Sequence, residues 1–164
     1  MFRAAVLLLL CAAVMGDGTT NLFKGCVRSP DRRVIPGICT LAPGRSLPGN
    51  PVLLRYAHKL LKRRTYQPRK GNRNTVLRLI RAGLMVTDPP RGQIVRVEFV
   101  TVQSDCDRSV RYNPDLCKPV GRKANGLCQA KFLVQYGLGV LQRGWCHTVV
   151  GRPSAEQDSA TVTP

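Results

Sequence analysis

The sequence predicts an α+β fold in which one N-terminal helix packs across a four-stranded antiparallel sheet, stabilised by disulfides. Apolar residues recur at helical spacing between residues 50 and 66, and they alternate with polar residues in later segments, as in half-buried strands. Six cysteines follow residue 16. A chain of 164 residues is long enough for one domain with its own core. A helix followed by strands is the order of a layered α+β domain.

The chain divides into four regions. Residues 1–16, MFRAAVLLLLCAAVMG, combine a basic start, a short apolar run and small residues, which predicts a signal peptide and a secreted, extracellular protein. Residues 17–48, rich in Gly, Pro, Arg and Ser, are expected to form a loop-rich extension. Residues 49–150 would be the folded domain, and 151–164 a disordered tail. No later apolar run reaches about 20 residues, so no integral membrane segment is expected.

The helix is predicted to begin after Asn50, a good N-cap, with Pro51 in the first helical position. Its apolar side would comprise Leu53, Ala57, Leu60 and Leu61, with Tyr56 beside them. The opposite side is basic. A solvated face over a core stripe is the common explanation of such a pattern, and a membrane-surface face is the alternative.

Four strands are expected after the helix. Residues 75–86 contain β-branched side chains that favour a strand, with Gly83 marking a bulge. Behind a proline-glycine kink, Val95, Val97 and Phe99 alternate with Arg96 and Glu98, the period of a half-buried antiparallel strand.

The last two strands are predicted to form a hairpin. The segment CQAKFLVQY, residues 128–136, alternates cleanly, GLG at 137–139 is a turn signal, and VLQRGWCHTVV, residues 140–150, returns.

Export favours disulfides among the cysteines that remain after the signal peptide. Cys-x-x-Cys pairs are absent and the two histidines are isolated, so no metal site and no cofactor is expected. Six cysteines allow fifteen connectivities. The simplest joins sequence neighbours, Cys26–Cys39, Cys106–Cys117 and Cys128–Cys146, and the others remain open at this point.

The formal net charge of +17 predicts attraction to polyanions. For an exported protein, sulfated glycans, anionic lipid and lipopolysaccharide are more accessible partners than nucleic acid, which would be bound without sequence preference. The residues expected to form an anionic-surface binding patch are Lys59, Lys62, Arg63, Arg64, Arg69, Lys70 and Arg73. The alternative is that high charge simply keeps a secreted protein soluble.

No catalytic constellation is found, so the protein is not expected to be an enzyme. The comparison considered was a secreted ribonuclease, but CKPVGRK, residues 117–123, shares only its first two residues with the Cys-Lys-x-x-Asn-Thr-Phe motif. His58 lies within the basic helix and His147 beside a cysteine, where solvated or packing histidines are expected.

Between about residues 50 and 146, the segments VRVEFVTVQSDC, DLC, GLCQAKFLV and WC resemble the cystatin superfamily. The resemblance implies a cystatin-like fold. It also implies that the first of four cysteines pairs with the second and the third with the fourth, here Cys106–Cys117 and Cys128–Cys146. Inhibitory cystatins insert a Gln-x-Val-x-Gly hairpin loop into papain-like proteases, helped by an N-terminal glycine and a Pro-Trp turn.

Here the loop position holds a degenerate sequence of which only the glycine matches: Asp88, Pro89, Pro90, Arg91 and Gly92. The second hairpin has QYGLG, residues 135–139, in place of Pro-Trp, and Gly49 could stand for the N-terminal glycine. Because two of the three inhibitory elements are missing, inhibition is disfavoured.

The DPP sequence and the run at Val95–Phe99 instead resemble the cathelin domain of cathelicidins, and the Val-Arg-x-Glu-Phe run and Gly121–Lys123 resemble chemerin. The tail after Cys146 departs from both families, being neither cationic nor aromatic. The leading hypothesis is a monomeric, secreted, cationic innate-defence protein that binds bacterial surfaces or lipopolysaccharide. The alternatives are a cysteine-protease inhibitor with an altered loop and a chemerin-like ligand of a cell-surface receptor.

Overall fold

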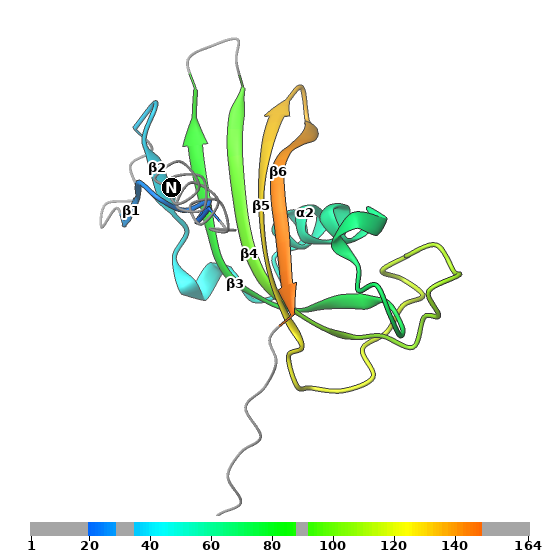
Figure 1. The fold of residues 1–164 in the computed structure, drawn as a ribbon. Helices are drawn as coiled ribbons and strands as arrows, with labels where there is room; N and C mark the ends of the chain where they lie inside the picture. Colours follow the sequence, from blue (N-terminus) through cyan, green and yellow to red (C-terminus); the bar gives the residue numbers. More distant parts are fainter. Residues whose placement is uncertain (1–19, 29–34, 88–91, 149–164) are drawn as a thin grey trace, which may run out of the picture.

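The computed structural model describes residues 20–28, 35–87 and 92–148. The predicted signal peptide and tail, and residues 88–91 of the altered loop, lie outside them. The main elements are one helix, α2 (Pro51–Leu61), and four long strands, β3 (Asn74–Val86), β4 (Gln93–Gln103), β5 (Gly126–Gln135) and β6 (Leu138–Thr148). Each long strand pairs antiparallel with the next, and α2 lies across one face of the sheet (Figure 1). This confirms the predicted α+β class.

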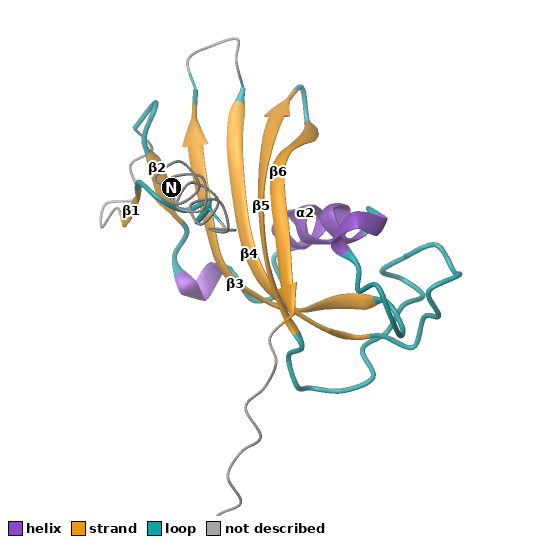
Figure 2. Cartoon of the chain, viewed as in Figure 1, coloured by secondary structure: helices purple, strands orange, loops and turns teal. Residues whose placement is uncertain are grey.

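The sheet has six strands among the described residues instead of the four predicted. The extension, expected to be loop-rich, contributes the short strands β1 (Cys26–Arg28) and β2 (Cys39–Leu41) and a 3-10 turn, η1 (Gly44–Ser46). β1 pairs parallel with β2, which pairs antiparallel with β3 (Figure 2). A strand of three residues is too short to show an alternating pattern in the sequence. The Cys26–Cys39 disulfide joins β1 to β2.

The helix begins where its sequence predicts. The Asn50 side-chain oxygen accepts hydrogen bonds from the backbone N–H groups of Val52 and Leu53, both at 3.1 Å, and Pro51 occupies the first turn. Lys62 caps the other end, so Arg64 belongs to a separate 3-10 turn, η2 (Arg64–Tyr66).

The core lies between α2 and the sheet. Leu60 of the helix and Phe99 and Phe132 of the sheet are completely buried. The rings of Tyr56 and Phe132 are 4.9 Å apart between centroids. Gly139 in β6 permits this close approach, because a Cβ there would lie 2.4 Å from Cε1 of Tyr56. The helix can therefore pack directly on the backbone of β6.

Gly83 does not mark a bulge, contrary to the sequence expectation. The register of β3 against β4 shifts between Val76 and Arg78 and again between Leu79 and Arg81. Gly83 instead lies against the first disulfide, where an added Cβ would be 3.0 Å from the Cys39 sulfur. A glycine is needed there because the disulfide packs on the backbone of β3.

The N-terminal segment, residues 20–24, covers part of the second face of the sheet. Leu22 and Phe23 are buried, and the Leu22 N–H donates to Oε1 of Gln129 on β5 at 2.8 Å. Beneath the segment, Glu98 is only 6% exposed and forms an ion pair of 2.8 Å with Arg81, whose guanidinium lies 4.3 Å from the Phe23 ring centroid. At Glu98, β4 is therefore buried on both faces, whereas Arg96 and Val100 on either side of it remain partly exposed, as the alternation predicts for a half-buried strand.

Candidate functional site

Two ends of the sheet differ in chemistry, and the first is defined by a row of paired residues. The Gly37 N–H donates to the Val86 carbonyl at 2.8 Å; Val86 pairs with Gln93, Gln93 with Val134, and Val134 with Gly139. This row places the turn before β2, the base of the β3–β4 hairpin and the β5–β6 turn at one end of the sheet (Figure 1).

This end, called here the apolar end, exposes large apolar side chains. They are Ile35 (52% exposed), Ile38 (39%), Tyr136 (93%), Leu138 (72%) and Val140 (56%). Tyr136 has a φ of 49° and Gly137 one of 75°, the left-handed pair that closes a tight hairpin and projects Tyr136 outward. Exposed apolar patches of this kind are typical of protein-binding surfaces.

The two hairpins at the apolar end enclose a groove of about 520 Å³. Its lining residues are Val86, Thr87, Gly92, Gln93, Val134, Gln135, Tyr136 and Gly137. Of the five residues predicted to form the altered loop, only Gly92 is among the described residues. Its φ is 89°, and a Cβ there would lie 2.3 Å from the Val134 carbonyl oxygen, so this position requires glycine.

The glycine that the extension places at the apolar end is Gly37, whereas the sequence analysis names Gly49 as the candidate for the N-terminal glycine. Gly37 is the member of the row contributed by the extension, whereas Gly49 directly precedes the N-cap of α2 and takes no part in the row. Sequence reasoning missed Gly37 because its position depends on the pairing of β2 with β3.

The second end consists of the loops that join α2 to β3 and β4 to β5 (Figure 2). The predicted cationic residues come from α2 and from the first of these loops. Five of the seven predicted residues are exposed in the connection after α2: Lys62, Arg63, Arg64, Arg69 and Lys70. Arg73 is only 3% exposed, and it donates to the carbonyls of Arg108, at 2.6 Å, and Val110. The ammonium of Lys59 donates to the carbonyl of Gly139 on β6. Arg73 is thus buried and engaged with backbone, which corrects its expected place in a surface patch, whereas Lys59 is exposed although its ammonium contacts a carbonyl. The binding role of these residues stays a prediction.

A cavity of about 510 Å³ opens among these loops, called here the basic cavity. It is lined by Arg64, Thr65, Gln67, Pro68, Arg69, Arg73, Arg108 and Ser109. Arg108 was not predicted, because its loop reaches the cavity from 39 residues beyond Arg69, whose carbonyl its guanidinium contacts. The only available signal was its position between two cysteines that the resemblance pairs.

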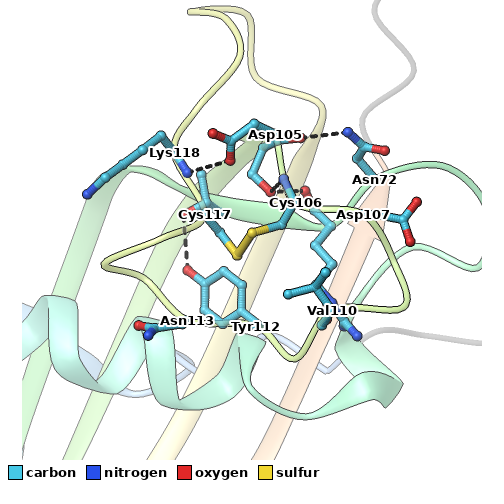
Figure 3. The surroundings of a disulfide bond; sticks show 12 residues. Asn72, Asp105, Cys106, Asp107, Val110, Tyr112, Asn113, Cys117 and Lys118 are labelled. Atoms are coloured by element: carbon cyan, nitrogen blue, oxygen red, sulfur yellow. Dashed lines mark hydrogen bonds between the residues drawn. A yellow bond between two sulfur atoms is a disulfide. The ribbon is translucent and has the colours of Figure 1, made fainter.

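The Cys106–Cys117 disulfide supports this loop (Figure 3). Beside it, the Asp105 N–H donates to the Lys118 carbonyl at 3.0 Å, and the Lys118 N–H donates to the Asp105 carboxylate at 2.8 Å. Tyr112 is buried beneath, and burial raises the pKa of its hydroxyl to about 12.

The Tyr112 hydroxyl lies 2.7 Å from Nδ1 of His58 and 3.0 Å from the hydroxyl of Thr75. Burial lowers the pKa of His58. His58 therefore has a packing role that ties the helix to the loop. His147 is exposed, with its ring 4.7 Å from that of Trp145 between centroids.

The structure pairs the six cysteines as sequence neighbours: Cys26–Cys39, Cys106–Cys117 and Cys128–Cys146. Within residues 20–28, 35–87 and 92–148, no three His, Cys, Asp or Glu side chains gather as metal ligands would. None of the helices in that part of the chain has the length and apolarity to cross a bilayer.

No known protein-family model matches the sequence, and no curated protein matches it. Solved structures similar in fold include two tick cystatins. Mialostatin, a gut cystatin from the hard tick Ixodes ricinus, is 23% identical with a TM-score of 0.51, over 62% of this chain and 94% of that one. A salivary cystatin from the soft tick Ornithodoros moubata is 18% identical with a TM-score of 0.53, over 69% of this chain and 99% of that one. The chain therefore has the cystatin fold, with the N-terminal segment, β1 and the Cys26–Cys39 disulfide adding to the helix and long strands.

Proposed function

We propose that the protein inhibits a papain-like cysteine protease by inserting its apolar end into the protease cleft. The observation that carries the proposal is the convergence at one end of the sheet of the extension and two hairpins, with Tyr136 and Leu138 as the most exposed large apolar side chains of the described residues. In this proposal these segments act as the three inhibitory elements that the cystatin resemblance implies.

The sequence disfavours inhibition because two of the three elements are missing by motif. Their chemistry is nevertheless available at the apolar end. Tyr136 and Leu138 supply an exposed apolar tip in place of the Pro-Trp turn, and Gly37, preceded by Ile35 and Pro36, supplies a glycine beside β3. Aromatic side chains at the centre of an interface commonly contribute most of its binding energy. The similarity in fold to two cystatins adds support.

The leading hypothesis from the sequence, a cationic defence protein acting on bacterial surfaces or lipopolysaccharide, stays a prediction. So do the cathelicidin and chemerin resemblances and the receptor-ligand alternative. A secreted location is proposed with the inhibitory function, and three disulfides support it because they persist in oxidising compartments.

The test is a titration of papain with the folded, disulfide-bonded protein. Active enzyme should fall linearly to zero at a fixed stoichiometry. The variant Tyr136→Asn with Leu138→Thr should weaken inhibition about tenfold or more, because it removes the exposed apolar tip. Asparagine tolerates the left-handed backbone of Tyr136, and threonine suits a strand, so the fold should be retained.

The matched control is Leu116→Thr, which removes an apolar side chain that is 65% exposed but lies within the Cys106–Cys117 loop. It should change the inhibition constant less than twofold. The absence of any inhibition would refute the proposed function. Inhibition that the tip variant leaves unchanged would refute the role of the apolar end.

A further inference from the structure

The basic cavity concentrates guanidinium groups at the end of the molecule opposite the apolar end. Residues 62–73 and 104–125 contain eleven Lys and Arg against three Asp. Four of the arginines line the cavity itself: Arg64, Arg69, Arg73 and Arg108. The one ion pair within the described residues is Arg81–Glu98, so none of these four forms a salt bridge with a carboxylate in that part of the chain.

The walls of the cavity are held in place before any ligand binds. Gln67 donates to the carbonyls of Leu61 and Asn74 and accepts from the Asn74 N–H, which fixes the connection after α2. Arg73 fixes the opposite loop through the carbonyls of Arg108 and Val110. A preformed site binds more tightly than one that must become ordered on binding.

The chemistry of the lining selects a tetrahedral oxyanion. A guanidinium offers five N–H donors in a planar fork that matches sulfate or phosphate oxygens, and Arg108 uses one nitrogen on the Arg69 carbonyl. The hydroxyl of Thr65 also lines the cavity, whereas no large apolar side chain does. A concave polar lining suits a discrete anionic group better than a planar membrane, which an apolar surface would have to penetrate.

Asp107 precedes Arg108 in the chain and interacts electrostatically with Arg73 of the cavity. Its carboxylate accepts from the backbone N–H of Ser109 at 2.8 Å and from its hydroxyl at 2.7 Å, and these hydrogen bonds lower the pKa of Asp107. Asp107 therefore stays charged and offsets one of the four guanidinium groups, leaving an excess of positive charge.

We propose that the basic cavity binds a sulfate group of a sulfated glycan, whose neighbouring sulfates contact the exposed cations around it. Those cations are Lys62, Arg63, Lys70 and Arg111. A glycan repeats its anionic groups along a flexible chain, which fits a cavity surrounded by separate cations on two loops. Because the apolar end lies at the other end of the sheet, the glycan would leave it free.

The test is titration of the folded protein with a heparin octasaccharide by calorimetry at low and physiological salt. Hyaluronan, which carries carboxylates but no sulfates, is the comparison ligand. The variant Arg64→Gln with Arg69→Gln should raise the dissociation constant for the heparin octasaccharide about tenfold or more, since each lost guanidinium removes charge-assisted hydrogen bonds. Arg73 is left unchanged because it holds the loop in place.

The matched control, Arg28→Gln with Arg45→Gln, removes the same charge from exposed residues outside the cavity. It should raise the dissociation constant less than twofold, and papain titration should be the same for all three proteins. If both variants weaken heparin binding equally, the cavity is not the binding site, and the net positive charge of the protein accounts for the binding. The proposal that the ligand is a sulfated glycan would be refuted by any of three results: equal binding of hyaluronan, no binding of heparin, or binding only to phosphatidylglycerol vesicles.

Discussion

Replacing Gly92 by alanine should destabilise the protein more than the same replacement at Gly137. Both glycines have positive φ, 89° and 75°, which costs an alanine about 1–2 kcal/mol. At Gly137 nothing lies within 4 Å of an added Cβ, so this conformational cost is the whole effect. At Gly92 the Cβ would lie 2.3 Å from the Val134 carbonyl oxygen, and forcing β4 and β5 apart adds about 1–3 kcal/mol.

The assay is urea unfolding followed by the fluorescence of Trp145, the single tryptophan. The free energy of unfolding should fall by about 2–5 kcal/mol for Gly92→Ala and about 1–2 kcal/mol for Gly137→Ala. The slopes of the two unfolding curves should be alike, because neither substitution changes the surface exposed on unfolding. Equal losses would refute the reasoning, since they would mean that Gly92 does not lie against the β5 backbone.

Three further predictions concern stability. Because burial lowers the pKa of His58 in the folded state, the unfolded chain binds the proton first, and the free energy of unfolding should decline as pH falls below about 6.5. In pH-dependent urea titrations, His58→Gln should remove this part of the decline; an unchanged profile would exclude His58 as its source. Replacing Cys26 and Cys39 by alanine should lower the free energy of unfolding by about 3 kcal/mol and speed proteolytic cleavage of the N-terminal segment. A variant that resists proteolysis as well as the wild type would contradict this prediction. Gly83→Ala should lower the free energy of unfolding by about 1–3 kcal/mol with the disulfide present, and by less in the variant that lacks both cysteines. If the effects of the substitutions simply add, the alanine side chain does not contact the Cys39 sulfur.

The helix and long strands could be predicted because their signals are local. The cap at Asn50 and the alternation from Val95 to Phe99 depend on neighbours in the chain. The covered second face could not be predicted in this way. Glu98 has the sequence context of a solvated side chain, and only the return of the N-terminal segment across the sheet buries it.

The candidate sites were predictable only in part. The exposed cations after α2 were predicted from their number and sequence proximity. Arg73 is buried, and Arg108 reaches the cavity, because a loop 35 residues further along the chain folds back onto this region. Counting charges along the sequence cannot reveal such a contact. The apolar end as a whole was missed because strand pairing, and not a motif, places Gly37 at the same end of the sheet as the β5–β6 turn.

The N-terminal segment also constrains the order of folding. Thr20 accepts hydrogen bonds from the side chains of Arg143, at 3.0 Å, and Trp145, at 3.1 Å, which lie 123 and 125 residues later. Contacts of such long sequence separation form late, because closing the intervening loop costs chain entropy. Among the described residues, Thr20 is made first and yet reaches its place only after β6 has been made, so on the nascent chain this end of the segment stays unpaired until then.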